Sequence, residues 1–559
     1  MSTFTLSVLK DFGLFHMEQE RNQTDRSPVQ LPSTKSYSLI WSGFVPVVVT
    51  AAIFYFLWRR IQAKPPYPPG PTPKFLIGNL LDMPKSKPWK TYREWSKKAG
   101  SAYSMVINTR QVLRANLVSQ GDLIHFEINS QHTVVINTKG LSDRMLNSRA
   151  GVYSDRPYVA MVDMLGWLPF NTSFLRYTDT WRKHRRLYQQ AFRSRSAQEY
   201  LPLQASKNSE FISKLREDPD NFMAHIRSLT AAVILDLIYG YEVTPTNNYL
   251  AELVEEITKF AETEFESPAT AIVNLFPALR HLPLSLPIFR FQRAAAKSQM
   301  LIEKLLDVPY DYVRKNMRTG EGRPSLMARF LEENDEEGGD KVQESVIKGV
   351  CATGYGAGVD TTAAVIETFF LAIAMHPDVQ AKARNELELV VGKGRVPGYE
   401  ERPNLPYIEA IIREVFRWVP PVPLSVPRAA FVDDVFDDYY IPKGAMVLSN
   451  IWAMSRDEAV YPNPESFVPE RFLNEDGTCN SDDDSTFIFG AGRRICPGRH
   501  FATTTLWMVI VSVLTEFDIG KPKTIDGKEM LKLADAKYTE GMISHPTPFL
   551  CSITPRSGD

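Results

Sequence analysis

The run from Phe489 to Gly498 constrains this chain more than any other stretch. It reads Phe-Gly-Ala-Gly-Arg-Arg-Ile-Cys-Pro-Gly, and it places Cys496 in a glycine-rich loop two residues after Arg494. A helix-like segment begins directly afterwards at Arg499. A sulfur at a helix N-terminus faces unpaired backbone N–H groups and the positive end of the helix dipole, and both favour thiolate over thiol. A thiolate held in this way can ligate iron.

The other cysteines do not suggest a competing metal site. The chain has four cysteines, and no two of them are spaced as CxxC, so neither a zinc site nor an iron–sulfur site is indicated. Four cysteines in 559 residues also do not indicate a disulfide framework. We interpret Cys351, Cys479 and Cys551 as small buried hydrophobic residues.

The neighbours of Cys496 have their own uses in such a loop. Gly492 and Gly498 permit a tight turn against a flat ligand. Phe489 can cover the sulfur from water, and Arg494 can pair with a carboxylate. The stretch resembles the haem loop of the cytochrome P-450 family, Phe-x-x-Gly-x-Arg-x-Cys-x-Gly, and every fixed position matches. The resemblance implies haem b with Cys496 as the axial thiolate ligand of the iron.

A second motif, Ala357–Thr362, lies in a long apolar stretch that we expect to be helical. Gly354, Gly356 and Gly358 would each cost about 1 kcal/mol in a helix relative to alanine, which indicates a required deformation or a close ligand; helix–helix packing through glycine is the alternative. The spacing is not GxGxxG, so a dinucleotide fold is not indicated. The segment resembles the oxygen-activation groove of the same family. There, Thr361 would hold water by hydrogen bonds and Asp360 would relay protons.

Further family motifs are spread along the chain. Glu414 and Arg417 match the Glu-x-x-Arg pattern, which the resemblance joins to Arg471 in a buried network; an exposed pair of little consequence is the alternative. A haem has two propionates and needs several N–H donors. The resemblance assigns propionate binding to Trp181, Arg185, Arg428 and Arg494.

An uncharged, mostly apolar run at residues 39–58 is long enough to cross a bilayer as a helix. We predict a transmembrane anchor there rather than a cleaved signal peptide. The basic residues that follow place the C-terminal part in the cytosol. Residues 1–38 would then be a lumenal tail of an endoplasmic reticulum protein, with a possible N-glycosylation site at Asn22. Residues 59–72 would form a basic and proline-rich hinge.

Residues 73–559 are expected to form one haem monooxygenase domain. Amphipathic stretches predict helices at 182–192, 221–237, 249–265, 292–315, 342–374 and 378–391, and β-like runs at 132–136 and 446–448. The pattern alone indicates a mainly α protein; the resemblance implies the cytochrome P-450 fold, a helical domain with a small β-sheet region. Residues 101–120 interrupt the family register. They are interpreted either as a translated intron or as a true loop insertion.

The motifs together predict a membrane-anchored haem-thiolate monooxygenase. It would insert one oxygen atom of O2 into a hydrophobic small molecule by hydroxylation or epoxidation. NADPH–cytochrome P-450 reductase is the implied partner because no flavin domain is recognised, so NADPH acts only through that reductase. The formal net charge of −1 does not indicate the positively charged surface that nucleic-acid binding requires. The chain most resembles fungal microsomal members of secondary metabolism or xenobiotic oxidation, such as O-methylsterigmatocystin oxidoreductase. A haem-thiolate isomerase or peroxygenase and a noncatalytic haem-binding protein remain alternatives.

Overall fold

The computed structural model describes residue 50 and residues 64–106, 121–244, 248–265, 267–281, 290–481 and 485–556. The chain divides into two compact units, Met1–Lys64 and Pro65–Asp559. The anchor predicted at 39–58, apart from residue 50, lies outside the described residues, and so do Asn22 and most of the insertion at 101–120.

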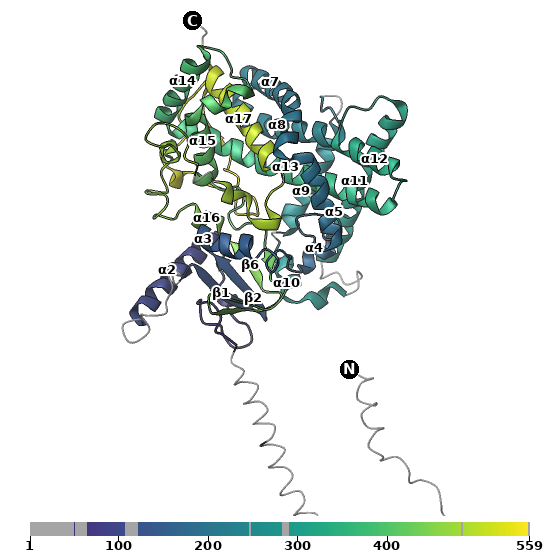
Figure 1. Ribbon diagram of the computed structural model, residues 1–559, viewed down its shortest axis with the longest axis vertical. Helices are drawn as coiled ribbons and strands as arrows, with labels where there is room; N and C mark the ends of the chain where they lie inside the picture. The colour runs from purple at the N-terminus through teal and green to yellow at the C-terminus, as the bar shows by residue number, and fades with distance from the viewer. Residues whose placement is uncertain are drawn as a thin grey trace, which may run out of the picture. The chain divides into compact units, whose positions relative to one another are not determined.

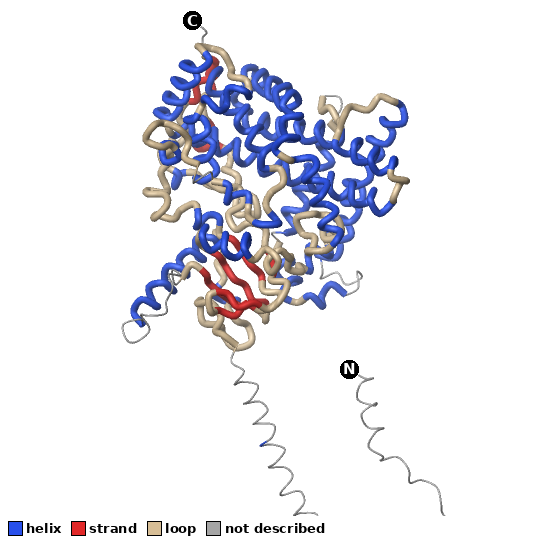
Figure 2. The backbone as a smooth tube through the Cα atoms, in the orientation of Figure 1, coloured by secondary structure: helices blue, strands red, loops and turns tan. Residues whose placement is uncertain are grey.

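The second unit is mainly helical; one group of strands lies to one side of the helices, and other short strands lie among the helices near the C-terminus (Figure 1, Figure 2). Its helices are α2 (Pro88–Val106), α3 (Lys139–Ser142), α4 (Ala160–Met164), α5 (Asp179–Phe192), α6 (Ser194–Ala197), α7 (Leu201–Glu217), α8 (Phe222–Tyr239), α9 (Tyr249–Phe265), α10 (Pro268–Leu275), α11 (Arg290–Thr319), α12 (Leu326–Glu336), α13 (Lys341–Met375), α14 (Pro377–Val391), α15 (Pro406–Trp418), α16 (Ile451–Met454) and α17 (Arg499–Glu516). The predicted helices are confirmed, with ends that differ by a few residues.

The strands are short and form four small sheets. They are β1 (Leu123–Ile128), β2 (Gln131–Ile136), β3 (Arg428–Ala429), β4 (Asp434–Phe436), β5 (Tyr439–Ile441), β6 (Met446–Ser449), β7 (Phe517–Ile519), β8 (Lys523–Thr524), β9 (Phe549–Leu550) and β10 (Ile553–Pro555). The largest sheet has the order β1-β2-β6-β3. Its β1–β2 hairpin turns through Asn129 and Ser130, both with positive φ, as a two-residue hairpin turn requires. Both predicted strands, at 132–136 and 446–448, are confirmed as β2 and β6.

Helix α13 runs through the middle of the helical core and packs against α5, α8, α11, α12, α14, α15 and α17. Asp340 caps its first turn by accepting a hydrogen bond from the Val342 N–H at 2.8 Å. Two helical segments in the described part of the chain are long and apolar enough to cross a membrane, 219–239 and 341–375, and most of each is buried in the domain. They are therefore core helices in this fold, as expected for helices that are apolar on all sides.

The proline-rich segment at the start of the second unit is held against the sheet region. The carbonyl of Pro69 accepts from the His125 N–H at 2.8 Å, and that of Pro66 accepts from the Tyr440 N–H at 2.8 Å. The ring of Tyr67 stacks on His125 with centroids 4.7 Å apart. At Gly70, a Cβ would lie 1.8 Å from the His125 carbonyl oxygen, so only glycine allows this approach.

Candidate active site

The loop that carries Cys496 is closed by its own backbone. The Cys496 N–H donates to the Phe489 carbonyl at 2.8 Å. Gly490 and Gly492 have φ of +80° and +56°, which glycine adopts without strain. A Cβ on Gly492 would lie 2.0 Å from the carbonyl oxygen of Leu146. The loop therefore requires glycine both for its turn and for its close approach to the segment before it.

Cys496 lies just before α17, as the sequence predicts. Burial raises the pKa of the Cys496 thiol; backbone N–H groups of Gly498 and Arg499 and the charge of Arg185 act in the opposite direction but do not outweigh burial. The helix end therefore does favour thiolate, as the sequence predicts, but burial outweighs it, and ligation to a metal would have to supply the deprotonation. The ring of Phe489 packs edge-on against Phe416 with centroids 5.2 Å apart.

The predicted cofactor-binding cations converge on this loop from three parts of the chain. Arg185 of α5 donates to the Ile495 carbonyl at 2.6 Å, and Arg428 of β3 donates to the Ala491 carbonyl at 2.6 Å. Arg494 donates to the Ser154 carbonyl at 2.9 Å, and its guanidinium lies 4.2 Å from the ring centroid of Trp181. The structure thus brings Trp181, Arg185, Arg428 and Arg494 together around the cysteine loop.

A fourth arginine, Arg156, joins them and was missed from the sequence. It is buried and donates to the Val426 carbonyl at 2.6 Å. Burial, then repulsion from Arg494 and Arg428, lowers the pKa of Arg156 well below its ordinary value. Burial lowers the pKa of Arg428 to about 10. Burial, together with repulsion from Arg428, lowers that of Arg494 to about 9. Only burial in the fold, which the sequence does not show, distinguishes Arg156 from a surface arginine.

These buried guanidinium groups are incompletely satisfied by the protein. Arg156 Nε, Arg428 Nη1 and Ser154 Oγ are buried without a hydrogen-bond partner among the described residues. The acid beside them, Asp155, is already held by Arg176 and by the Tyr177 N–H. Buried polar groups are normally paired, and unpaired cations are costly. The site therefore fits an anionic ligand such as the carboxylates of haem.

Asp360 and Thr361 lie on α13, where two of the three nearby glycines serve helix packing. A Cβ on Gly354 or Gly358 would approach side chains of α8 to 3.2 Å and 3.0 Å, whereas one on Gly356 would meet open space. The Thr361 hydroxyl donates to the Ala357 carbonyl at 2.7 Å. Such a bond satisfies the hydroxyl proton and leaves its oxygen free to accept.

Asp360 has a partner that the sequence did not indicate. His545 Nε2 lies 3.2 Å from Asp360 Oδ1, and His545 Nδ1 lies 2.9 Å from Glu367 Oε2. The second carboxylate oxygen of Asp360, Oδ2, is buried with no hydrogen-bond partner in the described residues.

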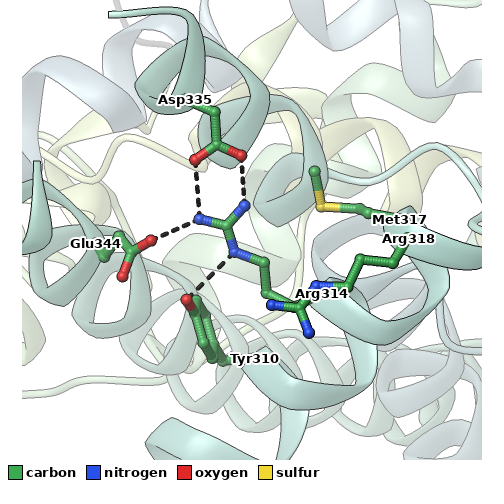
Figure 3. A pocket seen from close by; sticks show the side chains of 6 residues that line it. All are labelled: Tyr310, Arg314, Met317, Arg318, Asp335 and Glu344. Atoms are coloured by element: carbon green, nitrogen blue, oxygen red, sulfur yellow. Dashed lines mark hydrogen bonds and ion pairs between the residues drawn. The ribbon is translucent and has the colours of Figure 1, made fainter. Parts of the chain in front are cut away.

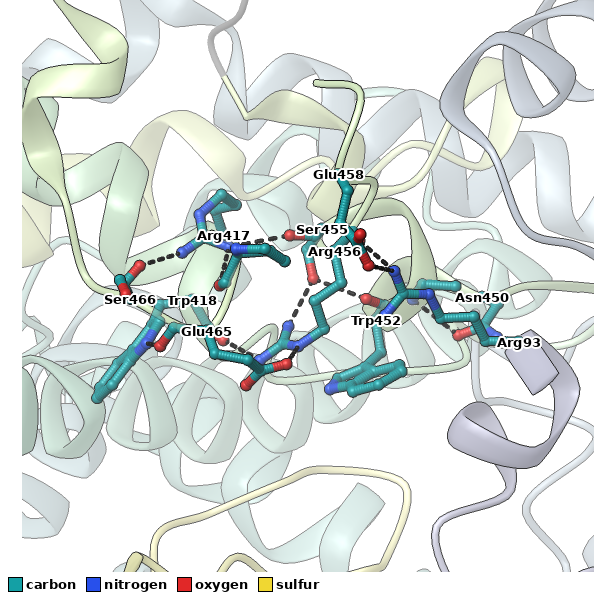
Figure 4. Close-up of polar contacts among 12 residues, drawn as sticks. Arg93, Arg417, Trp418, Asn450, Trp452, Ser455, Arg456, Glu458, Glu465 and Ser466 are labelled. Carbon is teal, nitrogen blue, oxygen red and sulfur yellow. Dashed lines mark hydrogen bonds and ion pairs between the residues drawn. The ribbon is translucent and has the colours of Figure 1, made fainter. Parts of the chain in front are cut away.

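The Glu414–Arg417 pair is fully buried, so the alternative of an exposed pair is excluded. Two hydrogen bonds of 2.6 and 2.7 Å join the guanidinium to the carboxylate, and Arg471 adds an ion pair to Glu414 at 3.3 Å. Arg417 also donates to the carbonyls of Ser455 and Ser466 (Figure 4). The network fastens α15 to the segment that precedes the cysteine loop.

A second arginine-containing region differs from the cysteine loop in how its guanidinium is paired. A surface pocket surrounds Arg314, whose guanidinium is already paired with Asp335 and Glu344 and bonded to Tyr310 (Figure 3). This cation therefore needs no anionic ligand, unlike those at the cysteine loop.

Comparisons with known proteins show the family to which this chain belongs. The Cytochrome P-450 family model matches residues 110–539. Cytochrome P-450 monooxygenase 98 of Postia placenta is 34% identical over 91% of this chain and 94% of its own length. Cytochrome P-450 monooxygenase COX1 of Coprinopsis cinerea is 35% identical over 88% and 92%. Tryptamine 4-monooxygenase of Psilocybe cyanescens is 32% identical over 92% and 97%.

The chain therefore belongs to the cytochrome P-450 family and is an oxygenase of the monooxygenase type. The family implies a haem iron with thiolate ligation. The mainly helical fold with small sheets is consistent with this membership.

Proposed function

We propose that this protein is a haem-thiolate monooxygenase that inserts one atom of O2 into an apolar small molecule. The observation that carries the proposal is the set of buried guanidinium groups, two of them incompletely paired, around the Cys496 loop. Electrons would come from NADPH through NADPH–cytochrome P-450 reductase. Residues 39–58 would anchor the chain in the endoplasmic reticulum membrane with the catalytic unit in the cytosol, and residues 1–38 would be lumenal.

Cys496 would provide the thiolate ligand of the iron. Arg156, Arg185, Arg428 and Arg494, with Trp181, would hold the haem carboxylates, since charge-assisted bonds to carboxylate suit guanidinium geometry. When bound, the haem supplies the chemistry that activates dioxygen. The edge-on contact of Phe489 with Phe416 would hold the Phe489 ring, and with it the start of the loop, in a fixed position.

Asp360 and Thr361 of α13 would bind and transfer protons. Asp360 can hold a proton at Oδ2, which is buried and has no partner among the residues that the structure describes. The Thr361 hydroxyl donates a hydrogen bond to the Ala357 carbonyl, so its oxygen can accept a hydrogen bond from a water molecule. A carboxyl and a hydroxyl at adjacent positions can therefore order water and pass protons toward the haem side.

The test uses full-length protein reconstituted with the reductase, NADPH and ¹⁸O2, against apolar compounds that first produce a spectral shift on binding. One ¹⁸O atom in the product, formed only with NADPH and reductase, supports the proposal. Product formed with hydrogen peroxide but not with NADPH and reductase would identify a peroxygenase. A rearranged product without oxygen would identify an isomerase. Ligand-induced shifts without any product would identify a haem-binding protein, and each of these three results contradicts the proposal.

A matched pair of variants tests the role of α13. Thr361→Ala is expected to lower the fraction of NADPH electrons recovered in product. Thr368→Ala is the control, because Thr368 makes the same kind of bond to the carbonyl four residues earlier, at 2.8 Å, on the same helix. Equal losses in the two variants would contradict a proton-handling role for Thr361.

A further inference from the structure

A loop near the C-terminus, residues 539–546, places His545 between two carboxylates of helix α13. The ring of His545 contacts Asp360 through Nε2 and Glu367 through Nδ1, at 3.2 and 2.9 Å. The loop is fixed in this position by its own bonds: the His545 N–H donates to the Thr539 hydroxyl at 2.9 Å, and the Ser544 N–H donates to the Pro421 carbonyl at 2.8 Å. These backbone bonds place the imidazole beside Asp360 and Glu367 of α13.

The contacts continue from His545 to the surface. The Glu367 side chain is fully buried, and its other oxygen, Oε1, lies 3.4 Å from Nε of Arg227 on α8. The Arg227 side chain is 60% exposed. Polar contacts thus join the exposed Arg227 to Glu367, His545 and Asp360 in series. Because a guanidinium does not release its proton, a water molecule beside Arg227 would have to deliver the proton to Glu367.

We propose that His545 is a positioning residue and proton carrier that supplies Asp360 with protons drawn from solvent through Glu367. The proposal rests on the proposed monooxygenase function, in which Asp360 delivers protons. In each transfer, Nε2 releases a proton to Asp360 Oδ1. The remaining proton stays on Nδ1; rotation of the ring then presents that proton to Asp360, while the bare nitrogen takes up a proton from Glu367. One proton moves at each step and no electron is transferred.

The charges around the ring support a protonated resting state. The charged groups that face it are Asp360 and Glu367 of α13, with Arg227 of α8 behind Glu367; Tyr538, a buried phenol, is also close to Glu367. Burial alone would lower the pKa of His545, but the hydrogen bonds to both carboxylates and their charges outweigh it and raise the pKa from 6.5 to about 9. The imidazole therefore carries a proton at neutral pH.

A purely structural clamp is the competing interpretation. It would account for the bond between the loop and α13, but not for the buried Asp360 Oδ2, which has no partner in the described residues and is free to pass a proton onward. A metal site is not indicated, because no group of three or more possible ligands was found among the described residues. The arrangement therefore favours proton transfer.

The test measures NADPH-driven oxygen consumption by the full-length haem-loaded protein with reductase, from pH 6 to 10, in H2O and D2O. The variants are His545→Gln and Glu367→Gln, with His281→Gln, an exposed histidine, as the matched control. Haem content and the carbon monoxide spectrum verify that each variant has kept its site. An NMR titration of the histidines follows the His545 ring directly.

In the wild type we expect oxygen consumption to fall as pH rises through about 9, because the ring loses its proton. His545→Gln should be slower by about tenfold, less than the 10²–10⁴ typical of an acid–base group that touches the substrate. It should also lose the pH-dependent fall and show a larger D2O effect. In Glu367→Gln, the midpoint of the His545 titration should move to lower pH, because a carboxylate charge beside the ring is removed.

Two results would overturn the inference, and they are distinguishable. If the wild type consumes oxygen and His545→Gln matches it in rate, pH profile and D2O effect, the proton role is wrong while the proposed function stands. If the wild type consumes no oxygen with NADPH and reductase, the proposed function fails and this inference fails with it.

Discussion

Arg417→Ala removes half of a fully buried ion pair. The guanidinium makes five hydrogen bonds, two to Glu414 and one each to three backbone carbonyls of the 455–466 segment. Their loss leaves a buried carboxylate whose remaining partners, among the described residues, are Arg471 and the Val468 N–H. Removing one partner of a buried pair costs about 3–5 kcal/mol. We expect loss of haem incorporation, since the network fastens the segment that precedes the cysteine loop.

The assay compares the haem-to-protein ratio and the urea midpoint for loss of the haem-thiolate absorbance, in full-length protein. Arg182→Ala is the matched control: Asp179 and Arg182 have the same i, i+3 spacing on a helix, but their side chains are 88% and 54% exposed. The control should retain normal haem content and stability. Normal haem content and midpoint in Arg417→Ala would refute the reasoning.

Three further predictions concern the loop, the cations and pH. Gly492→Ala should prevent haem incorporation, because its Cβ would meet the Leu146 carbonyl at 2.0 Å; a normal haem-to-protein ratio would contradict this. Arg428→Leu should release haem to apomyoglobin roughly tenfold faster or more, since a bond to a charged group contributes about 1.5–3 kcal/mol; an unchanged rate would exclude a carboxylate contact. Because the folded-state pKa of His545 is raised from 6.5 to about 9, its stabilising contribution is complete below pH 6.5 and is lost as pH rises through 9. Thermal melts of wild type and His545→Gln should converge above that pH, and a constant difference would contradict the linkage.

Local patterns predicted much of the fold. The long apolar run of α13 and the amphipathic patterns of α9 and α14 predicted the ends of these helices to within a residue or two. This works because burial of one face, or of all faces, gives the sequence a regular pattern of apolar residues. The glycine requirement at Gly492 was likewise visible, although its physical cause, the approach of the Leu146 carbonyl, was not.

What the sequence could not provide were contacts between distant segments. Arg156 is separated by more than 270 residues from Arg428, and only the fold shows that both are buried beside the same loop. His545 has no motif that links it to Asp360. The pKa of Cys496 also depends on burial, which outweighs the local helix-end effect that the sequence suggested.

The central claim is that Cys496 is the thiolate ligand of a bound haem. The most direct test is the reduced carbon monoxide difference spectrum of wild type and of Cys496→Ala, both in full-length form. The account predicts a thiolate-type band in the wild type and its loss in the variant. A wild type without that band, or a variant that retains it, would contradict the claim.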